Sequence, residues 1–100
     1  MSVLDVVIKE EYDRINRVIK SIESELSELP KGYISEKKIN GNAYYYLQNR
    51  EKKKIKSKYI KRDNVEAYKL LIAHRKELEQ ELKDMKSERR KLERILKYEG

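Results

Sequence analysis

The chain has 100 residues, 43% of them charged, and it lacks cysteine, tryptophan and phenylalanine. This length allows one domain at most, and the absence of cysteine excludes disulfides and thiolate metal sites. So polar a composition favours an elongated fold with a narrow apolar seam over a compact core.

The sequence predicts a first helix over residues 2–28. Ser2 and Asp5 have the spacing of a capping box. Apolar residues then recur at alternating steps of four and three, which is a heptad seam: Ile8, Tyr12, Ile15, Ile19, Ile22, Leu26 and Leu29. Pro30 ends this helix, and Gly32 allows the turn that follows.

Residues 33–61 predict a three-stranded antiparallel meander. Asn40-Gly41 indicates a type I′ hairpin turn, and a second turn falls within residues 51–54. In the resulting register, Tyr46 lies opposite Ser35 on one neighbouring strand and opposite Tyr59 on the other.

Strand alternation divides the side chains of this meander between two faces. The first face carries Tyr33, Ile39, Tyr44, Tyr46, Ile55 and Tyr59. The second carries Ile34, Tyr45, Leu47 and Ile60 with Lys38, Lys56 and Lys58. The sequence leaves open which face packs on the rest of the protein, although the apolar centre of the second face is compatible with packing.

A second helix is predicted over residues 64–98. Asp63 is a good N-cap, with Glu66 three residues later. Its heptad seam contains two arginines, which we expect to fix the register by pairing with a carboxylate on the facing helix. The seam is Leu71, Arg75, Leu78, Leu82, Met85, Arg89, Leu92 and Leu96.

Together these elements predict a mainly α, α+β fold in a single domain spanning residues 1–100. Two long antiparallel coiled-coil helices are joined by the small three-stranded antiparallel meander. Some apolar residues lie off the two seams and would stay half exposed in a two-helix coiled coil, so a homodimer is an open alternative. They are Val7, Val18, Val65, Leu70, Ile72 and Ile95.

The positive charge is concentrated in residues 50–62. Eight of these thirteen residues are basic and only Glu51 is acidic, whereas the rest of the chain has 17 residues of each sign. A focused basic segment beside tyrosines is typical of nucleic-acid binding, because cations neutralise phosphates and rings stack on bases. The candidate residues are Arg50, Lys52, Lys53, Lys54, Lys56, Lys58, Lys61, Arg62, Tyr44 and Tyr46.

A structural interpretation of the same residues is also open. Lysines protect edge strands from aggregation, and tyrosines are good strand formers that pack small cores.

The middle of the chain resembles a known group of sequences. The run Gly41-Asn42-Ala43-Tyr44-Tyr45-Tyr46, the turn at Arg50-Glu51 and the run Lys56-Ser57-Lys58-Tyr59-Ile60 carry the resemblance, which covers residues 29–61. The group consists of short uncharacterised bacterial proteins with a Gly-x-x-Tyr-Tyr-Tyr strand, an Arg-Glu-Gly-Gly-Lys turn and a Lys-Ser-x-Tyr-Ile strand between two helices. The resemblance implies this layout and a mobile-element or defence context, with no established activity. Here Lys52 and Lys53 stand where the group has glycines.

No catalytic motif accompanies these features. The sequence has no Gly-rich phosphate loop and no nucleophile–base pair, and His74 is the only histidine, so no second histidine or cysteine completes a metal site. We therefore predict a protein that is not an enzyme and needs no cofactor or metal. Residues 1–11 carry no basic leader or spanning segment, which predicts a soluble, cytoplasmic protein without membrane contact.

The favoured interpretation is a nucleic-acid-binding module that contacts the backbone of DNA or RNA through its basic, tyrosine-rich hairpin. The sequence does not distinguish DNA from RNA and shows no base-reading code. The alternative is a coiled-coil protein-interaction module with a protein partner. A variant of that alternative is a small phage or mobile-element inhibitor, similar to an anti-CRISPR protein, that blocks a nucleic-acid-handling complex.

Overall fold

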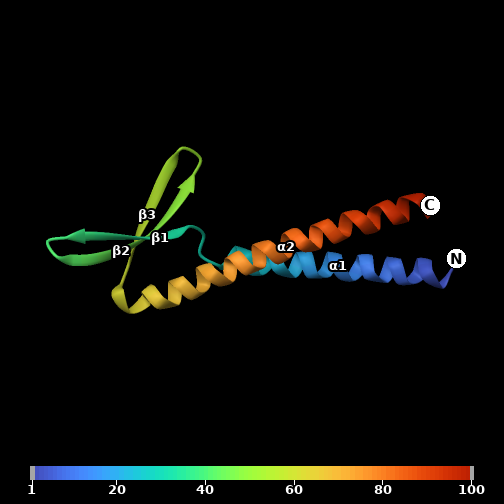
Figure 1. Ribbon diagram of the computed structural model, residues 1–100, viewed down its shortest axis with the longest axis horizontal. Helices are drawn as coiled ribbons and strands as arrows, with labels where there is room; N and C mark the ends of the chain where they lie inside the picture. The colour runs from blue at the N-terminus through green and yellow to red at the C-terminus, as the bar shows by residue number, and fades with distance from the viewer. Residues whose placement is uncertain (1, 100) are drawn as a thin grey trace. The chain divides into compact units, whose positions relative to one another are not determined.

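The computed structural model describes residues 2–99 (Figure 1). The predicted α+β class, with two long helices and a three-stranded antiparallel sheet, is confirmed. The elements in chain order are α1 (Val3–Glu28), β1 (Tyr33–Ile39), β2 (Asn42–Glu51), β3 (Lys54–Ile60), a 3-10 turn (Arg62–Asn64) and α2 (Val65–Glu99). Among the described residues, no helix combines the length and the apolar character needed to cross a membrane.

Two compact units make up the chain. The first contains α1 and the part of α2 from Glu77 onward, and the second runs from Leu29 to Lys76.

Helix α1 begins with the predicted capping box. The Ser2 N–H donates to Asp5 Oδ2, and the Asp5 N–H donates to Ser2 Oγ, both at 3.2 Å. These reciprocal bonds satisfy two N–H groups that have no acceptor within the helix. The helix ends at Glu28, two residues before Pro30.

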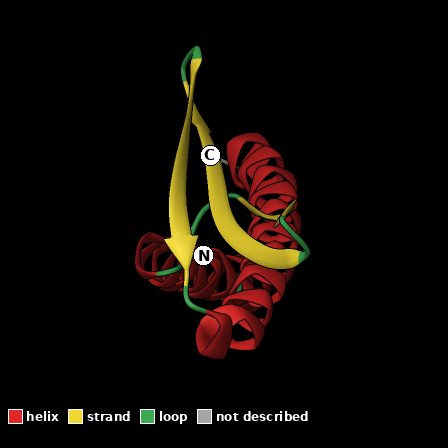
Figure 2. Cartoon of the chain, turned by 90° about the vertical axis from the view of Figure 1, so that its left-hand side faces the viewer, coloured by secondary structure: helices red, strands yellow, loops and turns green. Residues whose placement is uncertain are grey.

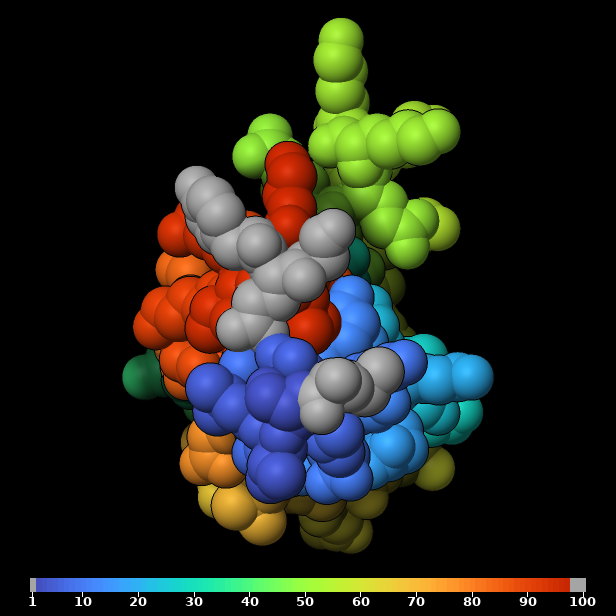
Figure 3. All heavy atoms as spheres, turned by 90° about the vertical axis from the view of Figure 1, so that its right-hand side faces the viewer, coloured from blue at the N-terminus to red at the C-terminus, as the bar shows by residue number. Residues whose placement is uncertain are grey.

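The first unit is an antiparallel pair of helices. Tyr12 Oη donates to Glu93 Oε1 at 3.3 Å, and Arg89 Nη1 donates to Asn16 Oδ1 at 3.1 Å. One turn forward on α1 thus corresponds to one turn back on α2, which fixes the antiparallel direction. Figure 3 shows the first turns of α1, in blue, beside the last turns of α2, in red.

The core of this unit follows the predicted heptad seam. Ile15, Ile19 and Ile22 of α1 and Leu78 of α2 are 2–6% exposed. Burying a side chain of this size contributes about 1.5–3 kcal/mol. The remaining positions of both seams in this unit are half-buried, as expected for two helices that pack through one stripe: Ile8, Tyr12, Leu26, Leu82, Met85, Arg89, Leu92 and Leu96.

The two arginines of the seam bind polar groups. Arg89 contacts an amide, Asn16, on the facing helix, and its carboxylate neighbour Glu93, at 3.8 Å, lies on its own helix. The prediction of a facing carboxylate is therefore wrong for Arg89, because the position opposite it is occupied by asparagine. In the second unit, Arg75 Nη1 donates to the Leu29 carbonyl at 3.0 Å, just past the last residue of α1. Carbonyls at a helix C-terminus lack N–H donors within the helix, and a guanidinium is a suitable donor to them.

The second unit contains the sheet, whose strand order is β1-β2-β3 and whose strands twist and curve (Figure 2). Ser35 pairs with Tyr46, which pairs with Tyr59, so the predicted register is confirmed. Asn40 and Gly41 have φ values of 51° and 81°, and a type I′ turn needs positive φ at both central positions.

The two sheet faces differ in burial. Ile60 is 2% exposed, and Ile34 and Leu47, which share its face, are half-buried. The apolar side chains on the opposite face that are 50–59% exposed are Tyr33, Ile39, Ile55 and Tyr59. The face that contains Ile60 is therefore the one that packs, and the opposite face is open.

The start of α2 departs from the prediction. The Asn64 N–H donates to the Lys61 carbonyl at 2.8 Å and closes the 3-10 turn, so Asp63 lies inside this turn instead of capping the helix. Leu71, predicted on the seam, is exposed, whereas Val65, predicted off it, is buried. The heptad seam assumes a helical neighbour along the whole of α2, but the first turns of α2 belong to the unit that contains the sheet.

Candidate nucleic-acid interface

The predicted basic segment forms the β2–β3 hairpin and the residues directly after it. All eight of its basic side chains are exposed. They occupy four places: β2 (Arg50), the turn (Lys52, Lys53), β3 (Lys54, Lys56, Lys58) and the chain that leads into α2 (Lys61, Arg62).

Three of these lysines form a row. Lys54, Lys56 and Lys58 alternate along β3, so they lie on one face of the sheet at intervals of about 6.7 Å. We call this face, which also carries Ile60, the lysine face. Arg50 pairs with Ile55 and lies on the other face, which we call the tyrosine face after Tyr33, Tyr44, Tyr46 and Tyr59.

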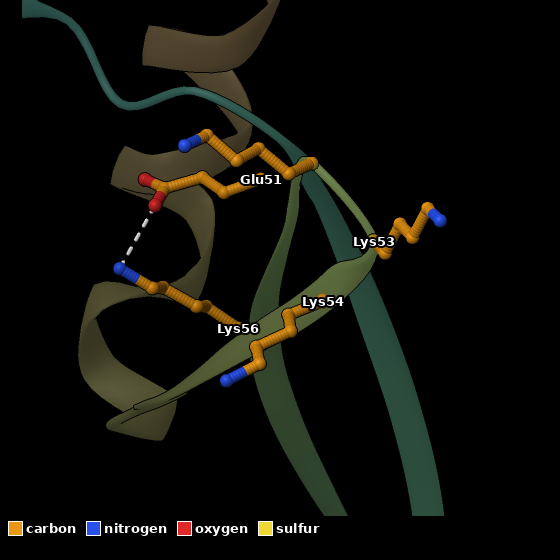
Figure 4. A pocket seen from close by; sticks show the side chains of 5 residues that line it. Glu51, Lys53, Lys54 and Lys56 are labelled. Carbon is orange, nitrogen blue, oxygen red and sulfur yellow. Dashed lines mark ion pairs between the residues drawn. The ribbon is translucent and has the colours of Figure 1, made fainter.

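An acidic residue moderates the lysine row. Glu51 Oε2 accepts from Lys56 Nζ at 2.8 Å, and the two side chains point toward one another (Figure 4). The hydrogen bond with Lys56 and the attraction of its charge lower the pKa of Glu51, and nearby Lys31 lowers it further. The same bond raises the pKa of Lys56. Because the pKa of Glu51 is lowered, the ion pair is complete at neutral pH and is lost only as pH falls through that lowered pKa.

The turn of the hairpin carries backbone strain. Lys52 has a φ of 56°, in the left-handed region that glycine adopts readily. Any other L-residue there costs about 1–2 kcal/mol. The chain therefore has a lysine at a position where glycine would relieve strain, and strained positions of this kind gather at functional sites.

The rings of the tyrosine face contact one another and a lysine. Tyr46 and Tyr59 meet edge to face, with centroids 5.8 Å apart and planes at 66°. Lys37 Nζ lies 5.2 Å from the centroid of the Tyr46 ring, a cation–π contact. Tyr46, predicted as a stacking residue, is thus half-buried and already engaged, and Tyr44 is also half-buried. Tyr59 and Tyr33 are the more exposed rings of this face.

Sequence reasoning missed several residues beside this surface. Lys31 lies close enough to Glu51 to lower its pKa. A shallow groove at the start of β1 is lined by apolar residues and two lysines, one of which, Lys69, is 3.3 Å from Glu66. Its lining is Tyr33, Ile34, Lys69, Ile72, Ala73 and Lys76. Only the antiparallel pairing of Tyr33 with Gln48 places Lys31 near the hairpin, so charge counting along the chain could not find it.

His74 lies exposed on α2. In the part of the chain that the structure describes, no three histidine, cysteine, aspartate or glutamate side chains gather closely enough to hold a metal ion.

Together these features define an α+β protein that presents a basic, tyrosine-bearing hairpin. A family model described as a domain of unknown function (DUF6788) matches residues 8–70, from the first turns of α1 to the start of α2. The chain belongs to this family. No curated protein and no solved structure matches the chain significantly.

Proposed function

We propose that the protein is a cytoplasmic nucleic-acid-binding module, and not an enzyme, that holds the phosphate backbone with its β2–β3 hairpin. The observation that carries the proposal is the row of Lys54, Lys56 and Lys58 on one face of an exposed strand, continued into the turn by Lys52 and Lys53.

A row of this kind suits a polyanion better than a single small anion. Its charges repeat at about 6.7 Å, similar to the repeat of phosphates along an extended strand. Each phosphate that a lysine neutralises releases a condensed counterion, so affinity falls with salt in proportion to the number of contacts. The ion pair with Glu51 weakens phosphate binding by Lys56 only slightly. Both groups are exposed, so Lys56 can readily exchange Glu51 for a phosphate.

The proposal is tested by fluorescence anisotropy with labelled duplex DNA, single-stranded DNA and RNA across a series of salt concentrations. If about five cations engage phosphates, log affinity falls against log salt with a slope near −4 to −5. Replacing Lys54, Lys56 and Lys58 together by glutamine should reduce that slope by about 3 and weaken binding to all three probes.

A charge-matched control separates the hairpin from the overall charge. Lys9, Lys20 and Lys83 are exposed helical lysines, and their triple glutamine variant removes the same charge. This control should bind like the wild type. Equal loss of binding in both triple variants would show that overall charge, and not the hairpin, holds the nucleic acid; no binding at low salt would refute the function itself.

Protein binding is the second candidate function. Four large apolar side chains in the first turns of α1 are exposed: Val3, Leu4, Val6 and Val7. Exposed apolar patches of this kind mark interaction sites. In this alternative the protein is a coiled-coil interaction module, or a mobile-element inhibitor whose partner handles nucleic acid. Replacing Val3 and Val7 by serine should then abolish binding to the protein partner, whereas the triple glutamine variant of the hairpin should still bind that partner.

A further inference from the structure

We infer that the nucleic acid bound by this hairpin is single-stranded, with its phosphates along the lysine face of β3 and its bases on the tyrosine face. The inference rests on the proposed function and specifies its substrate class. It is carried by the alternation of lysines with apolar and aromatic side chains along the exposed edge strand.

Strand β3 is an edge strand, because β2 is its only strand neighbour in the described sheet. Lys54, Lys56 and Lys58 point to one face, and Ile55 and Tyr59 point to the other. Both sets are exposed, with Ile55 at 59% and Tyr59 at 54%. The edge of β3 is therefore cationic on one side and apolar on the other.

A single nucleic-acid strand has a complementary cross-section. Its phosphates lie on one side and its unpaired bases on the other, and aromatic rings beside a basic track are how proteins bind such strands. A strand that follows the edge of β3 can place phosphates against the lysine row while its bases turn over the edge onto the tyrosine face.

The tyrosine face presents exposed rings on which such bases can stack. Tyr59 is fixed by its edge-to-face contact with Tyr46, 5.8 Å away, yet its own ring is half exposed. Beside it, Gln48 Nε2 donates to Ser57 Oγ at 3.2 Å, and these polar side chains separate Tyr59 from Tyr33 across the sheet. Exposed rings on β1 and β3 thus lie beside a polar pair, Gln48 and Ser57, with which base edges can form hydrogen bonds as donors or as acceptors.

A duplex fits this surface less well. Its bases are paired and stacked inside, so it offers phosphates to the lysine face but no ring surfaces to the tyrosine face. Duplex binding would use the cations and leave Tyr33, Ile55 and Tyr59 in water.

The test compares three labelled probes in anisotropy titrations: a single-stranded oligonucleotide of mixed sequence, an abasic strand of the same length and the corresponding duplex. The abasic strand has the same phosphates without bases. We expect the single strand to bind at least about tenfold more tightly than the abasic strand, because stacking on one ring gives this difference. Tyr59→Leu should remove most of the difference, and Tyr59→Phe should retain it.

Two comparisons keep the result interpretable. Tyr59→Leu should leave abasic-strand affinity unchanged, whereas the triple glutamine variant of the lysine row should weaken binding to all probes. Tyr33→Leu, on a different strand, provides a second ring variant, and far-UV circular dichroism checks that each variant folds. Salt-dependent binding that is equal for the single strand, the abasic strand and the duplex would overturn the inference while leaving the proposed function intact. Loss of all binding at low salt would refute both.

Discussion

Two glycines of the sheet unit allow a matched test of how much the close approach of the chain before β1 to β2 matters for stability. Gly32 precedes β1 and has a φ of 125°, and Gly41 lies in the β1–β2 turn with a φ of 81°. Both conformations favour glycine, but their surroundings differ. A Cβ at Gly32 would overlap the Gln48 carbonyl oxygen and lie 3.0 Å from the Gln48 carbonyl carbon, whereas a Cβ at Gly41 would meet nothing within 4 Å.

The two alanine substitutions should therefore differ in cost. At Gly41 only the left-handed backbone is penalised, by about 1 kcal/mol. At Gly32 a backbone strain of about 1–3 kcal/mol adds to a steric overlap with the main chain of β2. Relieving such an overlap requires a backbone shift that costs a further 1–3 kcal/mol or so. We expect Gly32→Ala to lower the free energy of unfolding by about 3 kcal/mol or more.

Urea unfolding followed by tyrosine fluorescence measures this difference. Five of the eight tyrosines lie in the strands, so the signal reports on the sheet. With a slope near 1 kcal/mol per molar urea, typical of a small protein, Gly32→Ala should shift the midpoint by about 3 M and Gly41→Ala by about 1 M. Equal shifts for the two variants would refute the reasoning, because they would show that the approach of Gly32 to β2 places no demand on the fold.

Three further substitutions test the hairpin and the helical pair. Glu51→Gln removes the carboxylate that competes with phosphate for Lys56, so polyanion binding should tighten while its salt slope stays near the wild-type value; unchanged anisotropy curves would show that Lys56 does not contact phosphate. Lys52→Gly should raise stability by about 0.5–1 kcal/mol in urea unfolding while weakening binding, because it removes strain and a charge together; tighter binding would contradict a role for this lysine. Ile19→Ala should cost about 2–4 kcal/mol in thermal or urea unfolding, whereas Ile95→Ala, on an exposed site, should cost less than about 1 kcal/mol; similar costs would contradict the observed core.

The sequence was most informative where one local rule decides the geometry. Asn40-Gly41 sets a type I′ turn, and a two-residue turn fixes every pairing in the hairpin it closes, so Ser35 lies opposite Tyr46 as predicted. The turn between Glu51 and Lys54 does the same for β2 and β3 and places Tyr59 opposite Tyr46. The capping box at Ser2 and the heptad spacing of α1 act in the same local way.

Prediction failed where the outcome depends on what a residue packs against. Leu71 continues the heptad pattern of α2, but the first turns of α2 lie in the unit that holds the sheet, and there Val65 is buried instead. The partner of Arg89 could not be deduced either, because it depends on the stagger between the helices, which the structure sets at Asn16. For the candidate site, composition identified the cations and the predicted register placed Lys56 and Lys58 on one face, but the sequence left open which face of the sheet packs, and the burial of Ile60 decides that.

The tip of the β2–β3 hairpin is a two-stranded ribbon. Tyr33 pairs with Gln48 at the start of β1, so β2 and β3 continue beyond that point as a ribbon without a third strand. Two-stranded ribbons are only marginally stable alone. Residues 49–56 include five basic residues and one acidic residue, and the basic side chains repel one another. Bound phosphates would remove this repulsion and favour the ordered ribbon. We therefore expect amides of residues 50–56 to exchange hydrogen rapidly in the free protein and more slowly in the presence of a saturating polyanion, as measured by hydrogen exchange and mass spectrometry. Equal exchange in both states would show that the polyanion does not order the ribbon.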